Sequence, residues 1–252
     1  IKGRVFLINA NGVLFAAGSR VDVGALVAST LDITNRDFLN NNYIFTADGE
    51  KNGSLVAAGD IFTVDGGFAI LVSNNGVTDT GTITALGGDA LLVAADSLTI
   101  NSSDSGLTGY TISGLNGTTT MGGVVDMAVT NGNGGLLETA GHTVTLSDGY
   151  QVGIGSNGTW SLSLPAITIG SDGNFTTLFV QNNLALRNLS LNALAGDITV
   201  NDAVNWSGNT MLTLGAEQDI NINKSITAAG DRAGLVMNYG GDYNLLTPAS
   251  YS

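Results

Sequence analysis

The side chains that most often carry catalysis or bind metals are scarce in this sequence. His142 is the only histidine, and none of the 252 residues is a cysteine. A zinc site built on histidine or a Ser-His-Asp triad needs an imidazole beside its partners, and thiol chemistry needs cysteine. His142 follows a glycine, which is typical of a surface turn. We therefore predict no catalytic residue of these classes and no cofactor.

Carboxylates are abundant, and β-helix enzymes that cut acidic polysaccharides use clustered carboxylates. Most aspartates here stand beside glycine or asparagine, which is turn chemistry; examples are Asp48-Gly49, Asp65-Gly66, Asp148-Gly149 and Asp172-Gly173. Such an enzyme would also need a group of basic residues for its substrate, and Lys and Arg together number 8. We expect no enzyme, and keep a polysaccharide-active β-helix enzyme as an alternative.

Calcium-binding solenoids use the nonapeptide G-G-x-G-x-D-x-U-x. Gly87-Gly88-Asp89 and Gly240-Gly241-Asp242 begin in the same way but lack the third glycine. The sequence therefore predicts no metal site.

The composition favours an all-β protein with many turns. There are 36 glycines and only 2 prolines, and glutamate occurs only at Glu50, Glu138 and Glu217. An apolar share of 43 % and the shortage of proline argue against a disordered chain. The net charge of −13 repels phosphate backbones, so we expect no nucleic-acid partner.

Three short strands are predicted near the start of the chain. Val5–Ile8 and Val13–Phe15 are mostly apolar, and Val21–Val23 alternates with a period of two. Turns at Asn9–Gly12 and Gly18–Arg20 separate these segments. Three strands joined by tight turns within about 25 residues are typical of one coil of a β-solenoid.

Two self-alignments give the period of the coils. Residues 60–72 align with 81–93 at an offset of 21, which places Gly66 on Gly87, Gly67 on Gly88, Phe62 on Ile83 and Leu71 on Leu92. Residues 197–201 align with 219–223 at an offset of 22, and Val204 then falls on Ile226. The sequence thus predicts a right-handed parallel β-helix (β-solenoid) of about 11–12 coils. Its inward residues would form aliphatic ladders, for example Ile198, Val200, Ile220 and Ile222.

Two stretches depart from this period. Within residues 34–53 we expect a helical turn at Asn35–Leu39 capped by Thr34, and a strand at Tyr43–Thr46. These elements would form a small excursion outside the solenoid. Residues 97–133 are rich in serine, threonine and glycine, and there we expect one or two longer loops.

The first coil also carries a resemblance to a known family. It resembles the secretion domain of two-partner secretion exoproteins, the TpsA or filamentous-haemagglutinin type. The hallmark of that family is I-N-P-N-G-[VI]-x-F followed by G-x-x-[IV]-x-V-G-x-L-[VI]-A-[ST]-T. The matching residues are Ile8, Asn9, Asn11, Gly12, Val13, Phe15, Gly18, Val21, Val23, Gly24, Leu26, Val27, Ala28, Ser29 and Thr30. Ala10 departs from the family, which usually has proline there.

The resemblance implies export by a TpsB-type outer-membrane transporter that recognises the turn Asn9, Ala10, Asn11 and Gly12. The same turn is equally well explained as a structural corner in which asparagine side chains bond the backbone. Residues 1–100 would be part of the secretion domain (haemagglutination-activity-like), and residues 101–252 would continue the β-helix repeats. Because the sequence opens on a strand, the signal peptide and the first part of the domain would lie before Ile1.

A function follows from the same resemblance. The chain would belong to an adhesin of a Gram-negative bacterium, a monomer secreted or held at the cell surface, which binds a receptor on a host cell or another bacterium. The alternative is the N-terminal part of a contact-dependent growth inhibition toxin. Some adhesins of the family carry sugars on Asn-x-Ser/Thr sequons. The candidate glycosylation sites are Asn52, Asn101, Asn116, Asn157, Asn174, Asn188, Asn205 and Asn223.

Overall fold

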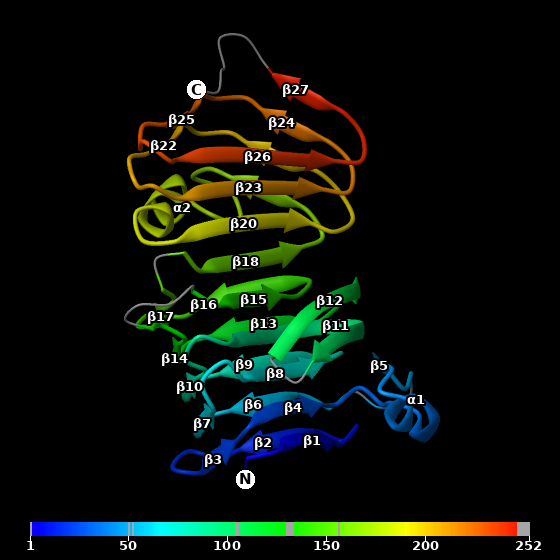
Figure 1. The fold of residues 1–252 in the computed structure, drawn as a ribbon. Helices are drawn as coiled ribbons and strands as arrows, with labels where there is room; N and C mark the ends of the chain where they lie inside the picture. The colour runs from blue at the N-terminus through cyan, green and yellow to red at the C-terminus, as the bar shows by residue number, and fades with distance from the viewer. Residues whose placement is uncertain are drawn as a thin grey trace. The chain divides into compact units, whose positions relative to one another are not determined.

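The computed structural model describes residues 2–49, 51, 53–103, 106–129, 134–155 and 157–245. The chain folds as two compact units, Ile1–Gly155 and Ser156–Ser252. Strands dominate both units, and within each unit they stack in parallel from coil to coil (Figure 1). The all-β, parallel β-helix fold predicted from the sequence is confirmed. In the part of the chain described, no helix is long and apolar enough to cross a membrane.

The first unit has five coils, and each adds one strand to each of three parallel sheets. The sheet of longer strands contains β1 (Arg4–Ile8), β4 (Ala25–Ser29), β8 (Phe68–Ser73), β11 (Asp89–Ser103) and β15 (Leu136–Ala140). A second sheet contains β2 (Val13–Phe15), β6 (Leu55–Ala57), β9 (Gly76–Asp79), β13 (Thr118–Met121) and β16 (Thr143–Leu146). The third contains β3 (Arg20–Val23), β7 (Asp60–Thr63), β10 (Thr82–Thr84), β14 (Val124–Asp126) and β17 (Gln151–Gly153). The strands predicted for the first coil are β1, β2 and β3.

The second unit has four coils. Its longer strands are β18 (Thr159–Leu164), β20 (Asn188–Ala193), β23 (Met211–Ala216) and β26 (Gly234–Tyr239). A second sheet contains β19 (Ile167–Ile169), β21 (Ile198–Val200), β24 (Ile220–Ile222) and β27 (Tyr243–Leu245), and β22 (Val204–Trp206) pairs with β25 (Ile226–Ala228). The helix α2 (Thr177–Leu184) lies beside β22 and β20.

The predicted ladders of the second unit are present in the predicted register. Ile198 pairs with Ile220 and Val200 with Ile222, and all four side chains are fully buried. Val204 pairs with Ile226, as the offset of 22 requires. An inward aliphatic residue therefore stacks on its own kind in the next coil.

In the first unit the offset of 21 is correct for one sheet and wrong for another. Leu71 pairs with Leu92 as predicted. Ile61, however, is the residue that pairs with Ile83, and Phe62 pairs with Thr84. Five residues separate Phe62 from Phe68, whereas four separate their partners Thr84 and Asp89, and this difference shifts the register of the short strands. Phe62 consequently faces outward, with the Arg20 guanidinium 3.8 Å above its ring.

The predicted Gly-Gly corners need glycine for two different reasons. Gly66 and Gly87 have φ of +75° and +62°, which strain any residue with a Cβ atom. Gly67 and Gly88 instead stack on one another, and a Cβ built on Gly88 would lie 1.7 Å from the carbonyl oxygen of Gly67. Close contact between neighbouring coils thus selects the second glycine of each pair.

The number of coils is lower than predicted. The described residues hold five coils in the first unit and four in the second, rather than 11–12. The period of 21–22 residues does not hold throughout, because two coils carry long insertions. Leu26 of β4 stacks on Ala69 of β8, 43 residues later. Ala90 of β11 stacks on Leu137 of β15, 47 residues later.

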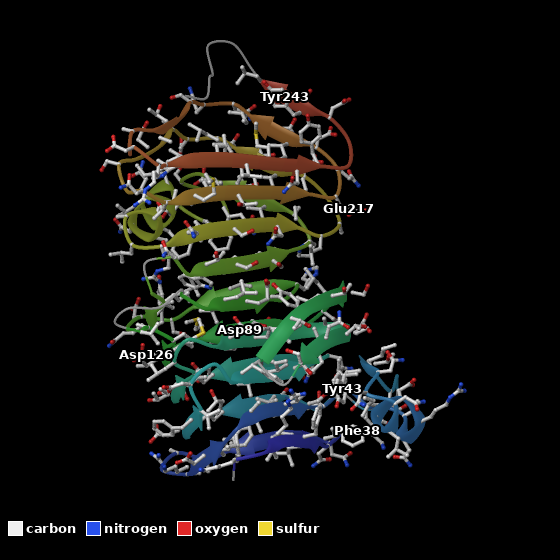
Figure 2. The ribbon with its side chains drawn as sticks, in the orientation of Figure 1. Phe38, Tyr43, Asp89, Asp126, Glu217 and Tyr243 are labelled. Carbon is white, nitrogen blue, oxygen red and sulfur yellow. The ribbon has the colours of Figure 1, made fainter. Side chains whose placement is uncertain are left out.

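The first insertion is the predicted excursion. Helix α1 (Asn35–Leu39) begins after Thr34, whose hydroxyl accepts a hydrogen bond from the Asp37 N–H at 3.0 Å, and β5 (Tyr43–Thr46) follows. Phe38 and Tyr43 contact each other there (Figure 2), with ring centroids 6.0 Å apart. Both rings pack on Phe6 of β1, at 5.1 and 5.0 Å between centroids. This aromatic cluster fixes the excursion to the first coil.

The second insertion is a hairpin within residues 97–115, where we expected a loop, whereas residues 130–133 of the same stretch lie outside the described residues. Strand β11 continues beyond its coil to Ser103, and β12 (Gly106–Leu115) returns antiparallel to it. Strand β5 pairs with the other edge of the extended β11, also antiparallel. An extra-helical sheet in the order β5-β11-β12 results. Serine and threonine in this stretch alternate with apolar residues such as Leu98 and Ile100, which are buried.

This extra-helical sheet covers the outer face of the long-strand sheet. Val27, Ile70 and Leu91 stack on that outer face and are buried in one cluster with Phe45 and Leu98. A parallel sheet covered on both faces needs apolar residues on both, which explains the continuous apolar runs of β4 and β8.

The buried ladder of the second unit can be tested by placing one charge inward or outward. Val200→Asp would bury an unpaired carboxylate between Ile169 and Ile222, and should lower the free energy of unfolding by about 3–5 kcal/mol. Thr199→Asp, one residue earlier and half-exposed, should cost under about 1 kcal/mol. Urea unfolding followed by tryptophan fluorescence measures the difference, because Trp160 and Trp206 both belong to this unit. Equal losses for the two variants would contradict the inward orientation of Val200.

Candidate functional site

The turn Asn9–Gly12 joins β1 to β2 in the first coil. Asn9 and Asn11 are exposed, whereas Ala10 and Gly12 are half-buried. The structure brings these residues together as one tight corner whose two asparagine side chains lie at the surface. The four residues differ in their roles: some of them shape the corner, and others remain available for recognition.

Asn9 shapes the corner through three of its groups. Its backbone N–H donates to the Ser29 carbonyl oxygen at 2.9 Å, and its carbonyl oxygen accepts from the Gly12 N–H at 3.0 Å. Its side-chain Oδ1 accepts from the Asn11 N–H at 3.2 Å, which closes an Asx turn. The structural explanation of the motif therefore applies to Asn9.

The other half of the corner packs against the next coil. The Ala10 carbonyl oxygen accepts from the Gly53 N–H at 3.2 Å, and the Val13 N–H donates to the Ser54 carbonyl oxygen at 3.1 Å. Gly12 has a φ of +121°, and a Cβ atom there would lie 3.2 Å from the Ser54 carbonyl oxygen. Within the described residues no hydrogen bond is recorded for the Ala10 N–H, so the departure from proline leaves the pattern of the turn unchanged.

Asn11 differs from Asn9 because its side chain takes no part in the turn. It is exposed, and in the described part of the chain its amide has no hydrogen-bond partner. A free carboxamide offers both a donor and an acceptor to another molecule. Of the four predicted site residues, Asn11 is thus the one whose whole carboxamide is unbonded in the described part of the chain, and the other three hold it in place.

The sequons differ in whether the amide nitrogen that would carry a sugar is free. In Asn116, Asn188 and Asn223 the side-chain nitrogen already donates, to Asp96, to the Asn157 carbonyl and to Asn201 respectively. No such bond is recorded among the described residues for the side-chain nitrogens of Asn101, Asn157, Asn174 and Asn205, all four exposed. Asn52 lies outside the described residues.

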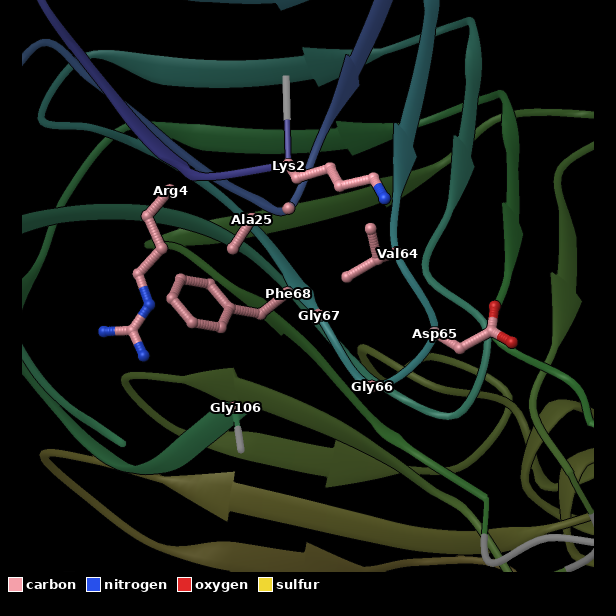
Figure 3. Close-up of a pocket in the computed structure, with 10 residues that line it drawn as sticks. Lys2, Arg4, Ala25, Val64, Asp65, Gly66, Gly67, Phe68 and Gly106 are labelled. Carbon is pink, nitrogen blue, oxygen red and sulfur yellow. The ribbon is translucent and has the colours of Figure 1, made fainter. Parts of the chain in front are cut away.

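The first unit also has a small pocket that the sequence did not predict. It has a volume of about 200 Å³ and includes Lys2, Arg4, Asp65 and Phe68 in its lining (Figure 3). The Arg4 guanidinium donates to Ser102 Oγ at 3.1 Å and to the Ser103 carbonyl oxygen, and it lies 5.9 Å from the Phe68 ring centroid. These contacts join β1 to the end of β11, so Arg4 helps to hold the extra-helical hairpin against the first coil.

Another hollow, of about 310 Å³, brings together Asp32, Asp37 and Asp48 in the excursion. Hydrogen bonds from Thr34 and Asn42 lower the pKa of Asp37. Asp32 accepts from the Ile33 N–H at 2.8 Å, and Asp48 lies 3.8 Å from the Lys51 ammonium. Each carboxylate thus has a local turn partner. No group of three or more metal-ligating side chains is found among the residues described.

Among solved structures, the chain is similar in fold to the crystal structure of the HMW1 secretion domain from Haemophilus influenzae. The two sequences are 19 % identical and superpose with a TM-score of 0.51, over 99 % of this chain and 78 % of that one. No protein-family model matches the sequence, and no curated protein matches it. At this identity the likeness establishes a shared fold.

The different roles of the two asparagines can be separated by stability. Asn9→Ala removes the acceptor of the Asx turn and should lower the free energy of unfolding by about 1 kcal/mol. Asn11→Ala should change it by less than about 0.5 kcal/mol, because no bond is lost and the backbone there is not left-handed. Urea unfolding followed by circular dichroism gives both values. A larger loss for Asn11→Ala than for Asn9→Ala would reverse the two roles.

Proposed function

We propose that this chain is the secretion-domain region of a bacterial two-partner secretion exoprotein, exported by a TpsB-type outer-membrane transporter. The observation that carries the proposal is the likeness of fold to the HMW1 secretion domain, which extends over 99 % of this chain. The residues that resemble the family's motif support it independently, because two of them, Asn9 and Asn11, lie exposed at a single corner.

The turn Asn9–Gly12 is the part that we propose the transporter recognises. Recognition requires a group that is presented in a fixed place and is not already bonded within the protein. Asn11 meets both conditions, since the Asx turn of Asn9 and the close packing of Gly12 on Ser54 hold it and its own amide is free. Within this proposal, residues 1–100 act as part of the secretion domain and residues 101–252 continue its β-helix.

Once outside the cell, the exoprotein acts as an adhesin of a Gram-negative bacterium. A stack of coils presents long, regular surfaces, which suit display at a distance from the cell and contact with a receptor on a host cell or another bacterium. The acidic composition, with a net charge of −13, keeps such a protein soluble and apart from nucleic acids. We propose that it functions as a monomer.

Export of the full-length exoprotein tests the recognition role. With its transporter present, Asn11→Ala should reduce the secreted amount several-fold, while circular dichroism of the purified variant stays unchanged. Asn182→Ala is the matched control, because Asn182 is exposed on α2 and has no recorded bond in the described part of the chain. Normal secretion of an Asn9→Ala, Asn11→Ala double variant that folds correctly would contradict the recognition role of this turn.

The sequons are tested by the mass of the native secreted protein. Attachment of a sugar needs a free side-chain amide, so we expect mass increments of whole hexose units. Asn205→Gln should lose the increment at its own site, and Asn188→Gln should keep the increments of the wild type. Peptide mass spectrometry locates the sugars. An unmodified mass for the secreted chain would exclude glycosylation.

A further inference from the structure

One inward column of the first unit contains a carboxyl group. In the sheet β2-β6-β9-β13-β16, the last residues of the strands stack as Phe15, Ala57, Asp79, Met121 and Leu146. Asp79 is fully buried, and so are its two direct neighbours, Ala57 and Met121. An acidic side chain therefore occupies a place that the coils before and after it fill with apolar groups.

The carboxyl group of Asp79 is poorly satisfied in this position. Its Oδ1 accepts one long hydrogen bond, from the Gly81 N–H at 3.3 Å. Its Oδ2 is buried and has no hydrogen-bond partner in the structure. The next coil presses closely on it, since a Cβ atom built on Gly123 would lie 2.7 Å from Oδ2. An ionised carboxylate needs several donors, and here it has one at most.

Among the described residues, no counter-charge compensates for this burial. The side chains stacked on Asp79 are Ala57 from β6 and Met121 from β13, and the corners beside it are Gly81, Gly122 and Gly123. The fifth coil adds the Ser147 hydroxyl next to Gly122. None of these described neighbours has an acidic or basic side chain. Losing a proton would leave an unpaired charge inside the ladder, which proteins avoid by keeping the group neutral.

We propose that the third coil of the first unit stacks with Asp79 protonated, so that stacking takes up a proton and weakens as the pH rises. The neutral form suits the site for two reasons. It carries no charge into the apolar column, and its O–H becomes a donor where the carboxylate has only acceptors. This inference concerns the stability of the coils and does not depend on the proposed export.

The direction of the pKa agrees with this geometry. Burial raises the pKa of Asp79 from 3.8 to about 7, against a smaller opposing effect of the Gly81 hydrogen bond. The unfolded chain ionises Asp79 near 3.8, whereas the folded chain holds the proton until about 7. The folded state therefore binds the extra proton between these values. Its advantage is largest below 3.8, falls as the pH rises through the window, and is lost above about 7.

Other groups also contribute to the pH dependence of the whole chain. Burial raises the pKa of Asp89 as well, which acts in the same direction, whereas hydrogen bonds lower the pKa of Asp37, which acts in the opposite one. Repulsion within a chain of net charge −13 also grows with pH. The contribution of Asp79 must therefore be measured as a difference between variants.

The test compares the wild-type chain with Asp79→Asn and Asp79→Leu by hydrogen exchange and mass spectrometry. Peptides covering β9, β10 and β13 are followed from pH 5 to pH 8, with exchange corrected for its intrinsic pH dependence. From pH 5 to pH 6 the opening equilibrium constant of the wild type should rise about tenfold relative to either variant, as one bound proton requires. Above pH 7 the difference between them should level off.

Asp148→Asn is the matched control, because it replaces the same carboxyl group by an amide in an exposed turn of the same unit. Its pH profile should follow that of the wild type. If the wild type and Asp79→Leu gave parallel profiles from pH 5 to pH 7, the proposal would be overturned. If neither variant folds, the side-chain carboxyl carbon of Asp79 in the wild type is followed by NMR from pH 4 to pH 8. A titration midpoint well above 3.8 supports the proposal, and a midpoint near 3.8 overturns it.

Discussion

The structure depends on the stacking of each coil on the next in register. A single coil cannot bury its apolar side alone; it does so only when the coils above and below place apolar residues at the same corner. The fully buried pairs Ile198–Ile220 and Val200–Ile222 show this directly. Main-chain hydrogen bonds between parallel strands fix the spacing, and the side chains decide which register is stable. An inward side chain must therefore pack against the coils on both sides as well as within its own coil.

This constraint explains how much of the fold could be predicted. The turns and short strands of the first coil have local signals, and so does Thr34 before α1, so these elements were predictable. The length of β11 was not, because its second half is held by β5 and β12, whose partners lie far away in the sequence. Helix α2 has a local signal as well, because Thr176 caps it and Phe179, Val180 and Leu184 follow at helical spacing. That signal is short and stands between alternating strands, which favour a strand there.

The location of the candidate site could be predicted from the sequence, but the separate roles of its two asparagines could not. The Asn-x-Asn-Gly sequence indicates a turn with local side-chain bonds, and either asparagine could have supplied them. The structure assigns the bond to Asn9, because its Oδ1 reaches the Asn11 N–H while Ser54 occupies the other side of the corner. The position of Ser54 depends on the excursion of residues 34–53, which returns the chain beside its first coil. A separation of more than 40 residues cannot be read from local spacing.

The same stacking rule distinguishes amides from carboxylates. Asn223 donates to Asn201 at 2.8 Å and Asn244 donates to Asn221 at 2.9 Å, because an amide carries both a donor and an acceptor and can pair with its own copy. Stacked aspartates are bonded differently. The backbone N–H of Asp219 donates to the carboxylate of Asp197, and the backbone N–H of Asp242 donates to the carboxylate of Asp219. Asp79 has neither arrangement on its inward side. A bound proton makes the buried carboxyl group of Asp79 compatible with its apolar neighbours. Through this one carboxyl group, the stacking of the coils depends on pH.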